Sequence, residues 1–265
     1  MIAPTLTATT IRKNYGKSTP VNSVSFEVSS GSVHGLLGPN GSGKTTTLHI
    51  VTGLLDSDGG EVTISGRGIA DKASRASFGF APDDLALPTA LTGREFLTFH
   101  DTLRARDDRE RAKLLADALG IAADLDKLVM EYSHGMQRKL QLIAAVMHNP
   151  RLLVLDEPFR GLDPEASVTV RTLLSSFVAG GGAVLVATHD MLRAERECDT
   201  VTILSDGRTV AQGSPASLRL ANEGCSSLED VFMRVTGRDS DMARRADAVA
   251  TAFTTNTFSP RQRGT

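Results

Sequence analysis

The chain has 265 residues, of which 40% are hydrophobic and 23% are charged, and its formal net charge at pH 7 is -2. These values are typical of a globular protein with a sizeable core, and a charge so near zero argues against a nucleic-acid-binding polyelectrolyte, so no nucleic-acid partner is expected. The apolar runs are shorter than the roughly 18 residues of a membrane-spanning helix, and the N-terminus lacks the charged and apolar regions of a signal peptide.

The first part of the chain predicts a strand, a glycine-rich loop and a helix. Residues 24–28 alternate like a half-buried strand, and residues 33–37 form a short apolar run. This run enters the sequence GPNGSGKTT, which fits the phosphate-loop pattern G-x-x-x-x-G-K-[ST], and residues 45–55 continue as a helix. An ordinary glycine turn beside a surface lysine is the alternative, but a chance match in a chain of this size is rare, about one in a hundred.

The chemistry of this loop suits the phosphates of a nucleoside triphosphate. Its glycines let successive backbone N–H groups curl around a phosphate, and the following helix points its positive dipole end into the same space. Lys44 can reach the β- and γ-phosphates, and the Thr45 hydroxyl can ligate Mg²⁺. The predicted phosphate-binding residues are Gly38, Pro39, Asn40, Gly41, Ser42, Gly43, Lys44, Thr45 and Thr46.

Beyond residue 60 the pattern predicts a further strand, a helical stretch and a return to strands. Residues 61–66 read as a strand and turn, and residues 84–150 are helical, with a capping box at Thr92 opening a helix over 96–103 and an amphipathic helix over 109–119. Residues 152–155 and 183–187 are continuous apolar runs, typical of parallel strands buried on both faces. Asp163 and Pro164 start the helix between them. From about residue 238 the periodicity fades, which predicts a frayed helix and a loose tail.

Two adjacent carboxylates follow the apolar run at residues 152–155. This order places Asp156 and Glu157 at the carboxyl end of a buried strand, the edge where open α/β sheets bind ligands. Asp156 would hold Mg²⁺, through water or directly, while Glu157 would polarise the attacking water. A solvated acidic turn is the alternative, and the phosphate loop favours the functional interpretation.

Five sequence blocks together resemble the ABC-type ATPases. They are the phosphate loop, the Asp156–Glu157 pair, YSHGMQ at residues 132–137, GLDP at 161–164 and THD at 188–190, in the order of that family. The resemblance covers roughly residues 5 to 237. The block at 132–137 discriminates best, because it is similar to the ABC signature, which other P-loop ATPases lack. Its departures from the LSGGQ form are similar to those of the multidrug and antibiotic exporter branch, the ABC-2 type.

The resemblance implies an α/β fold with a P-loop NTPase (RecA-like) core, an N-terminal antiparallel β-subdomain and an inserted α-helical subdomain. The ATPase domain would span residues 1–237, with a core formed by 1–83 and 151–237 and a helical subdomain over 84–150. Residues 238–265 would be a flexible C-terminal tail.

The resemblance also assigns roles on the two sides of the nucleotide. Tyr15 would stack on adenine, a contact that tolerates different bases, although a lone tyrosine in a polar stretch is more often a half-exposed packing residue. Ser133 would cap a helix and contact the γ-phosphate on a second subunit, within a signature made of Ser133, His134, Gly135 and Met136. His134 replaces a glycine and would be strained if that position needs a positive φ.

Three more residues receive roles by resemblance. His189 follows a strand and would contact the γ-phosphate beside the catalytic Glu157, and Asp163 would connect the two active sites of a dimer. Asp83 stands where the family has a glutamine that touches Mg²⁺ and water, so it becomes a candidate metal ligand with Thr45 and Asp156, since carboxylate oxygen suits a hard cation. A turn-forming Pro-Asp-Asp explains the same residues.

The implied function is an ATP-binding and ATP-hydrolysing subunit, with ATP and Mg²⁺ as its cofactors, that couples dimerisation to export through a separate transmembrane permease subunit. The chains would form a homodimer or heterodimer when ATP-bound, in the cytoplasm on the inner face of the membrane. A soluble ABC-type ATPase acting on ribosomes or DNA repair, or an importer ATPase, is the alternative. One phosphate loop and no sustained heptads favour the transporter. A P-loop kinase or GTPase would leave the signature unexplained.

Overall fold

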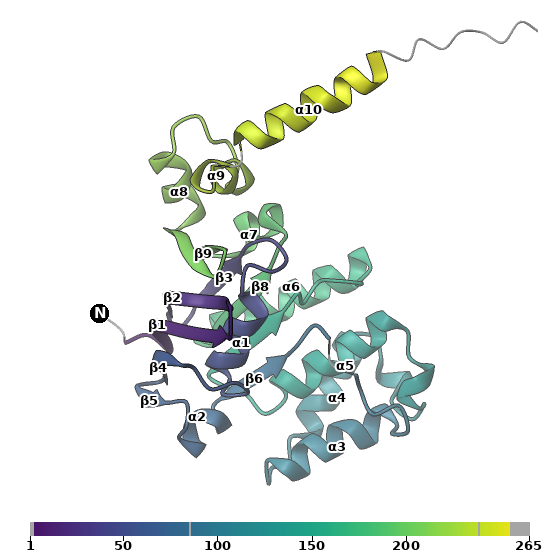
Figure 1. The fold of residues 1–265 in the computed structure, drawn as a ribbon. Coiled ribbons are helices and arrows are strands. Elements are labelled where there is room, and N and C mark those ends of the chain that lie inside the picture. The colour runs from purple at the N-terminus through teal and green to yellow at the C-terminus, as the bar shows by residue number, and fades with distance from the viewer. Residues whose placement is uncertain (1–2, 85, 238, 255–265) are drawn as a thin grey trace, which may run out of the picture.

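A computed structural model describes residues 3–84, 86–237 and 239–254 of the chain. Its strands form an antiparallel sheet near the N-terminus and a larger sheet in the middle of the molecule (Figure 1). The antiparallel sheet has the order β2-β1-β4-β5 and contains β1 (Leu6–Tyr15), β2 (Ser18–Val28), β4 (Gly59–Ile64) and β5 (Arg67–Gly68). This sheet is the expected N-terminal β-subdomain.

The larger sheet has the strand order β10-β9-β3-β8-β7-β6. Its strands are β3 (Val33–Leu37), β6 (Phe78–Ala81), β7 (Leu152–Asp156), β8 (Ala183–Thr188), β9 (Thr200–Ser205) and β10 (Arg208–Gly213). Only the edge pair β9–β10 is antiparallel among these pairings. The carboxyl ends of β3, β7 and β8 therefore meet at one edge, and the α/β core that the sequence predicts is confirmed.

Both faces of the larger sheet are buried, as its apolar runs predict. Along β7, Leu152 and Val154 pack with the antiparallel sheet and with α1 (Lys44–Val51). Leu153 and Leu155 point the other way, toward α5 (His134–Val146) and α6 (Pro164–Ala179). A strand covered on both sides needs apolar residues at every position, which explains the continuous run.

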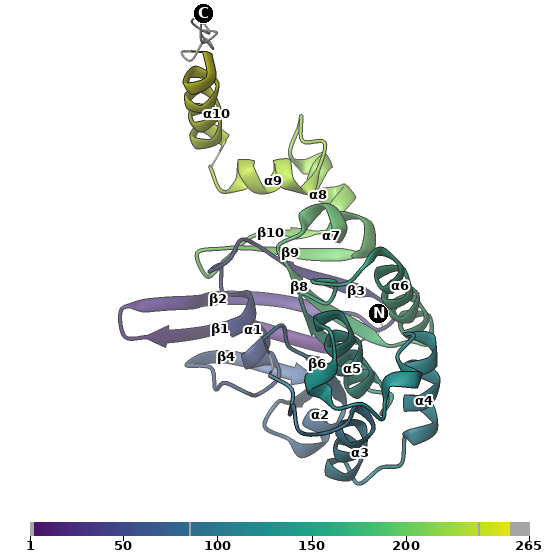
Figure 2. The same cartoon turned by 90° about the vertical axis from the view of Figure 1, so that its right-hand side faces the viewer.

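The helical stretch between β6 and β7 forms a separate layer beside the sheet (Figures 1 and 2). It contains α3 (Gly93–Leu103), α4 (Arg109–Ala118), α5 and the 3₁₀ turns η1 (Ala122–Asp124) and η2 (Val129–Glu131). The predicted capping box is present, because Thr92 accepts from the backbone N–H of Glu95 while the Glu95 carboxylate accepts from Thr92. These helices are the predicted helical subdomain.

The remaining helices are α2 (Lys72–Ala76), α7 (Met191–Glu197), α8 (Pro215–Ala221), α9 (Leu228–Val235) and α10 (Asp239–Thr254). The buried residues Leu228, Val231 and Phe232 of α9 pack onto β9 and α7. Asp239–Thr254, where the sequence predicts a frayed helix and a loose tail, forms a helix that extends away from the rest of the molecule in both views (Figures 1 and 2), and the flexibility of this tail stays a prediction. Arg238 and residues 255–265 lie outside the described residues. In the part of the chain that the structure describes, no helix is both long and apolar enough to cross a membrane.

Candidate functional site

The glycine-rich loop joins β3 to α1 and is shaped by close backbone approaches. Gly43 precedes α1 with φ 99°, a left-handed conformation that favours glycine, and a Cβ there would overlap the carbonyl oxygen of Pro20. Gly41 also has a positive φ of 82°, but a Cβ on it would meet no atom within 4 Å. No side chain caps the start of α1, so its first N–H groups stay available to an anion.

Two polar side chains of the loop point to an anionic ligand. The Lys44 ammonium donates to the carbonyl oxygens of Gly38 at 2.8 Å and Pro39 at 3.2 Å, so it folds back into its own loop. Burial lowers the pKa of Lys44, and the nearby carboxylates of Glu157 and Asp156 oppose this shift. The Ser42 hydroxyl is buried without a hydrogen-bond partner among the described residues. A phosphate would satisfy both groups.

The end of β7 supplies oxygen ligands suited to Mg²⁺. The Thr45 hydroxyl donates to Oδ2 of Asp156 at 3.1 Å, which brings the two predicted ligands together. Burial raises the pKa of Asp156 to about 6, and a cation would favour its ionised form. No cluster of three or more His, Cys, Asp or Glu residues in the described chain could hold a metal. Mg²⁺ bound with substrate phosphates needs only one or two protein carboxylates, so the donor set fits this ion.

Glu157 is held by the carboxyl end of β8. The Thr188 hydroxyl donates to its Oε2 at 2.8 Å, and the backbone N–H of His189 donates to its Oε1 at 2.9 Å. Nδ1 of His189 lies 2.6 Å from the same Oε1. Glu157 itself has φ 47°, a left-handed conformation that is unusual for a residue other than glycine. Thr188 was not among the predicted site residues.

A cavity of about 490 Å³ collects most of the predicted site. Its lining includes residues of the phosphate loop, of the segment after β6 and of the end of β7: Asn40, Gly41, Gly43, Lys44, Thr45, Thr46, Asp83, Asp156 and Glu157. Pro39 and His189 line a neighbouring cavity that also includes Asn40. One chain therefore brings the loop, both carboxylates and His189 to one edge of the sheet.

The signature residues are not among those that line this cavity. Ser133 caps α5, and its hydroxyl accepts from the backbone N–H of Met136 at 3.2 Å. His134 is the first residue of α5 and has no positive φ, so the condition under which strain was expected is not met. Its ring packs against Gly161, where a Cβ would overlap it, and Gly161 lies two residues before Asp163. Asp163 caps α6 as predicted, accepting from the N–H of Ala166.

Tyr15 ends β1 with 54% of its surface exposed. The Lys13 ammonium lies 5.7 Å from the centre of its ring. The exposed ring is free to stack on a base, and its role in adenine binding stays a prediction.

Asp83 is bound by two arginines. Oδ1 of Asp83 accepts from Nη2 of Arg138 at 2.8 Å, and Oδ2 accepts from Nη1 of Arg160. The predicted metal role of Asp83 stays a prediction. Arg138 was missed by the sequence reasoning, although an arginine among the apolar residues of helix 134–146 was a usable signal, because a buried charge needs partners.

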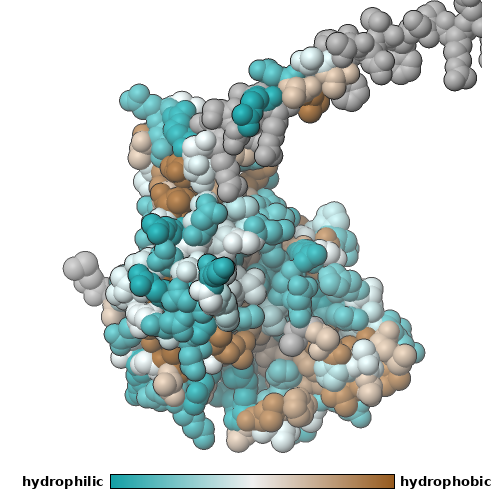
Figure 3. Space-filling model, viewed as in Figure 1, coloured by the Kyte–Doolittle hydropathy of each residue, from teal (hydrophilic) through white to brown (hydrophobic). Residues whose placement is uncertain are grey.

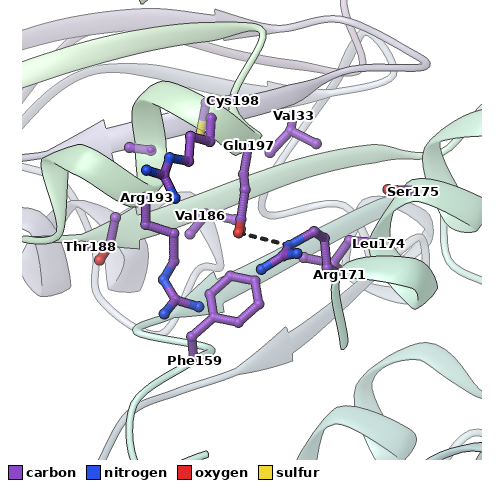
Figure 4. A pocket seen from close by; sticks show the side chains of 12 residues that line it. Val33, Phe159, Arg171, Leu174, Ser175, Val186, Thr188, Arg193, Glu197 and Cys198 are labelled. Carbon is purple, nitrogen blue, oxygen red and sulfur yellow. Dashed lines mark hydrogen bonds and ion pairs between the residues drawn. The ribbon is translucent and has the colours of Figure 1, made fainter. Parts of the chain in front are cut away.

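A third cavity of about 160 Å³ lies between α6 and α7 (Figure 4). Thr188 lines it together with apolar residues such as Val33, Leu174 and Val186 and with charged residues that include the Arg171–Glu197 ion pair. The Arg193 guanidinium stacks on the Phe159 ring at 4.4 Å. Thr188 is thus shared between this cavity and the carboxylate of Glu157.

Comparison with known proteins agrees with this geometry. Residues 21–160 match the family described as "ABC transporter". The chain is 36% identical over 224 residues to the Nod factor export ATP-binding protein I of Paraburkholderia xenovorans (strain LB400), covering 83% of this chain and 74% of that protein. It is 34% identical over 218 residues to the linearmycin resistance ATP-binding protein LnrL of Bacillus subtilis (strain 168), covering 80% and 70%.

A solved structure has the same fold. It is described as the ATP-binding subunit of an ABC transporter and is similar with a TM-score of 0.82 and 29% identity, over 87% of this chain and 99% of that one. The family match spans more than half of the residues, and the glycine-rich loop, the acidic end of β7 and residues 132–137 lie within it. The chain therefore belongs to the ABC transporter family, as an ATP-binding domain.

Proposed function

We propose that this chain is a Mg²⁺-dependent ATPase that drives export through a separate membrane subunit. The observation that carries the proposal is the placement of Glu157, whose carboxylate lines the same cavity as Lys44 and is held by Thr188 and His189. A carboxylate fixed beside a triphosphate-binding loop can orient a water for attack on the terminal phosphate.

Each residue of the site has a part in this reaction. The loop N–H groups and Lys44 neutralise the phosphate charge, and Glu157 orients the attacking water and accepts its proton. His189 fixes Glu157 and would contact the γ-phosphate. Thr45 and Asp156 would hold Mg²⁺, which supplies charge neutralisation at the phosphates when bound.

The signature requires a second chain. Because Ser133 caps α5 away from the phosphate-loop cavity, we propose that it contacts ATP bound by a partner copy or by a related subunit. Asp163, at the start of α6, would lie at the same interface. In this dimer Tyr15 would stack on the adenine of its own chain's ATP.

The helical subdomain offers a surface for the membrane subunit. Figure 3 shows apolar residues on this part of the molecule, and its exposed large hydrophobic side chains are Phe99, Leu103, Leu114, Leu128 and Met130. The names of the relatives concern Nod factor export and linearmycin resistance, which favours export over import. We propose that a permease holds the chain on the cytoplasmic face of the membrane. A soluble ABC-type ATPase is the alternative.

Two measurements test this function. The purified chain should release phosphate from ATP with Mg²⁺, and Lys44→Ala should lose both this activity and the thermal stabilisation by ATP, which is about 2.7 kcal/mol when ATP is at 100 times its Kd. Affinity purification from membranes should recover a multi-span protein. Recovery of ribosomal or DNA-repair proteins instead would favour the alternative, and unchanged ATP stabilisation of Lys44→Ala would reject the site.

A further inference from the structure

Arg138 connects the signature helix to the acidic end of β7. Its side chain is 3% exposed, and its Nη2 donates to the backbone carbonyl oxygens of Asp156 and Glu157, both at 2.7 Å. Nη1 donates to the carbonyl oxygen of Pro82 at 2.6 Å. One buried guanidinium thus ties α5 to β7 and to the segment that follows β6.

These hydrogen bonds act on a strained residue. Glu157 has φ 47°, and a left-handed conformation persists at a non-glycine residue only where its surroundings fix it. Its carbonyl oxygen accepts from Nη2 of Arg138 and from the backbone N–H of Arg160 at 3.0 Å. The direction of the Glu157 side chain, and so the position of its carboxylate, follows from this backbone conformation.

Asp83 supplies the negative charge that a buried guanidinium needs. Its two oxygens are divided between Arg138 at 2.8 Å and the exposed Arg160. With both oxygens occupied in this way, the carboxylate is placed as a counter-ion for Arg138. Coordination of Mg²⁺ would compete with these ion pairs.

We propose that Arg138 is a positioning residue that holds Glu157 for hydrolysis, and that Asp83 acts as its counter-ion. This inference rests on the proposed ATPase function. Arg138 lies on the helix that Ser133 caps, so a displacement of α5 at the dimer interface is transmitted to the Glu157 backbone through one side chain. The signature and the attacking water are thereby coupled within a single chain.

The first test is steady-state ATP hydrolysis by Arg138→Gln. The expected result is a kcat about 10- to 100-fold lower than that of the unchanged protein, because hydrogen bonds from a charged donor are lost, with a KM for ATP within about two-fold. Lys139→Gln, on the next residue of the same helix, is the matched control and should leave both values unchanged. Arg138→Lys keeps the charge without the forked donor geometry, so its kcat should also fall.

The second test separates a counter-ion from a metal ligand at Asp83. Asp83→Asn should lower kcat without changing the Mg²⁺ concentration for half-maximal activity. The double variant of Asp83→Asn and Arg138→Gln should lose less kcat than the product of the two single fold-losses, since both changes break the same ion pair. A half-maximal Mg²⁺ concentration raised about ten-fold or more in Asp83→Asn, with fully multiplicative losses, would overturn the counter-ion role.

The outcomes distinguish this inference from the function on which it rests. An unchanged protein without ATPase activity rejects the proposed function. If the unchanged protein is active and both Arg138→Gln and Arg138→Lys are as active as Lys139→Gln, the positioning role of Arg138 is overturned and the proposed function stands. The ATP-dependent thermal shift of each variant verifies that it folds and binds ATP. If Arg138→Gln does not fold, Arg138→Lys decides, and a kcat of Arg138→Lys equal to that of the unchanged protein overturns the positioning role of Arg138.

Discussion

Nδ1 of His189 lies 2.6 Å from Oε1 of Glu157, and the backbone N–H of His189 reaches the same oxygen at 2.9 Å. Two residues from the ends of neighbouring strands, β7 and β8, are therefore joined at the edge of the sheet where ATP would bind. The pair connects the residue that would orient water with the residue that would contact the phosphate being removed.

His189→Ala removes the imidazole and leaves the backbone N–H and Thr188 to hold Glu157. We expect kcat for ATP hydrolysis to fall about 10- to 100-fold, the cost of one hydrogen bond to a charged group, while the ATP-dependent thermal shift persists. Phosphate release and thermal unfolding with ATP measure the two quantities. A variant that keeps full kcat would contradict the role of this pair.

Gly43→Ala and Gly41→Ala form a matched pair within the phosphate loop. Both positions have positive φ, which costs about 1–2 kcal/mol for alanine, but only the Cβ at Gly43 would also overlap Pro20. We expect Gly41→Ala to lower Tm by a few degrees, at about 2–4 °C per kcal/mol for a chain of this size, and Gly43→Ala to lower it by clearly more. Calorimetry without nucleotide measures both. Equal losses would contradict the packing of the loop on Pro20.

The burial of His34 predicts that the protein loses stability in acid. The ring is buried between Thr200 and Thr202, which hydrogen-bond to its nitrogens at 2.8 and 2.9 Å, and burial lowers its pKa from 6.5 to about 4. The unfolded state therefore binds a proton that the folded state does not as the pH falls from about 6.5 to about 4, so the free energy of unfolding falls over this window, by about 3 kcal/mol at its lower end.

His34→Asn tests this explanation by urea unfolding across that pH window. The variant should lose about 1–3 kcal/mol at neutral pH, because the threonines lose partners, and its stability should then depend less on pH. The exposed His134→Gln should keep the steep dependence of the unchanged protein. An identical pH slope in His34→Asn would show that other groups cause the acid sensitivity.

Local sequence signals predicted the parts of the site that lie within one stretch of chain. The phosphate loop, the apolar run of β7, the cap at Thr92 and the helix start at Asp163 depend on residues that are neighbours in sequence, and the strands and caps form where these signals place them. The α/β core with its helical insertion followed from the order of such signals, and the resemblance to the ABC-type ATPases supplied the rest of the fold class.

The parts that escaped prediction depend on residues far apart in the sequence. The ion pair between Asp83 and Arg138 joins the segment after β6 to α5, and no spacing rule indicates it. The hydrogen bond from Thr188 to Glu157 likewise follows from the pairing of β8 with β7. The extent of the helix over Asp239–Thr254 was not predicted because its alanine-rich sequence lacks a strong apolar period, although alanine has a high helix propensity.

The most direct test of the central claim is ATP hydrolysis by Glu157→Gln. This change keeps the size of the side chain and one acceptor oxygen for the hydrogen bonds from Thr188 and His189, but it removes the charge that orients water. We expect steady-state phosphate release to fall by at least about 100-fold while ATP still binds, so that size-exclusion chromatography shows a dimer that holds ATP. Phosphate release at the rate of the unchanged protein would contradict it.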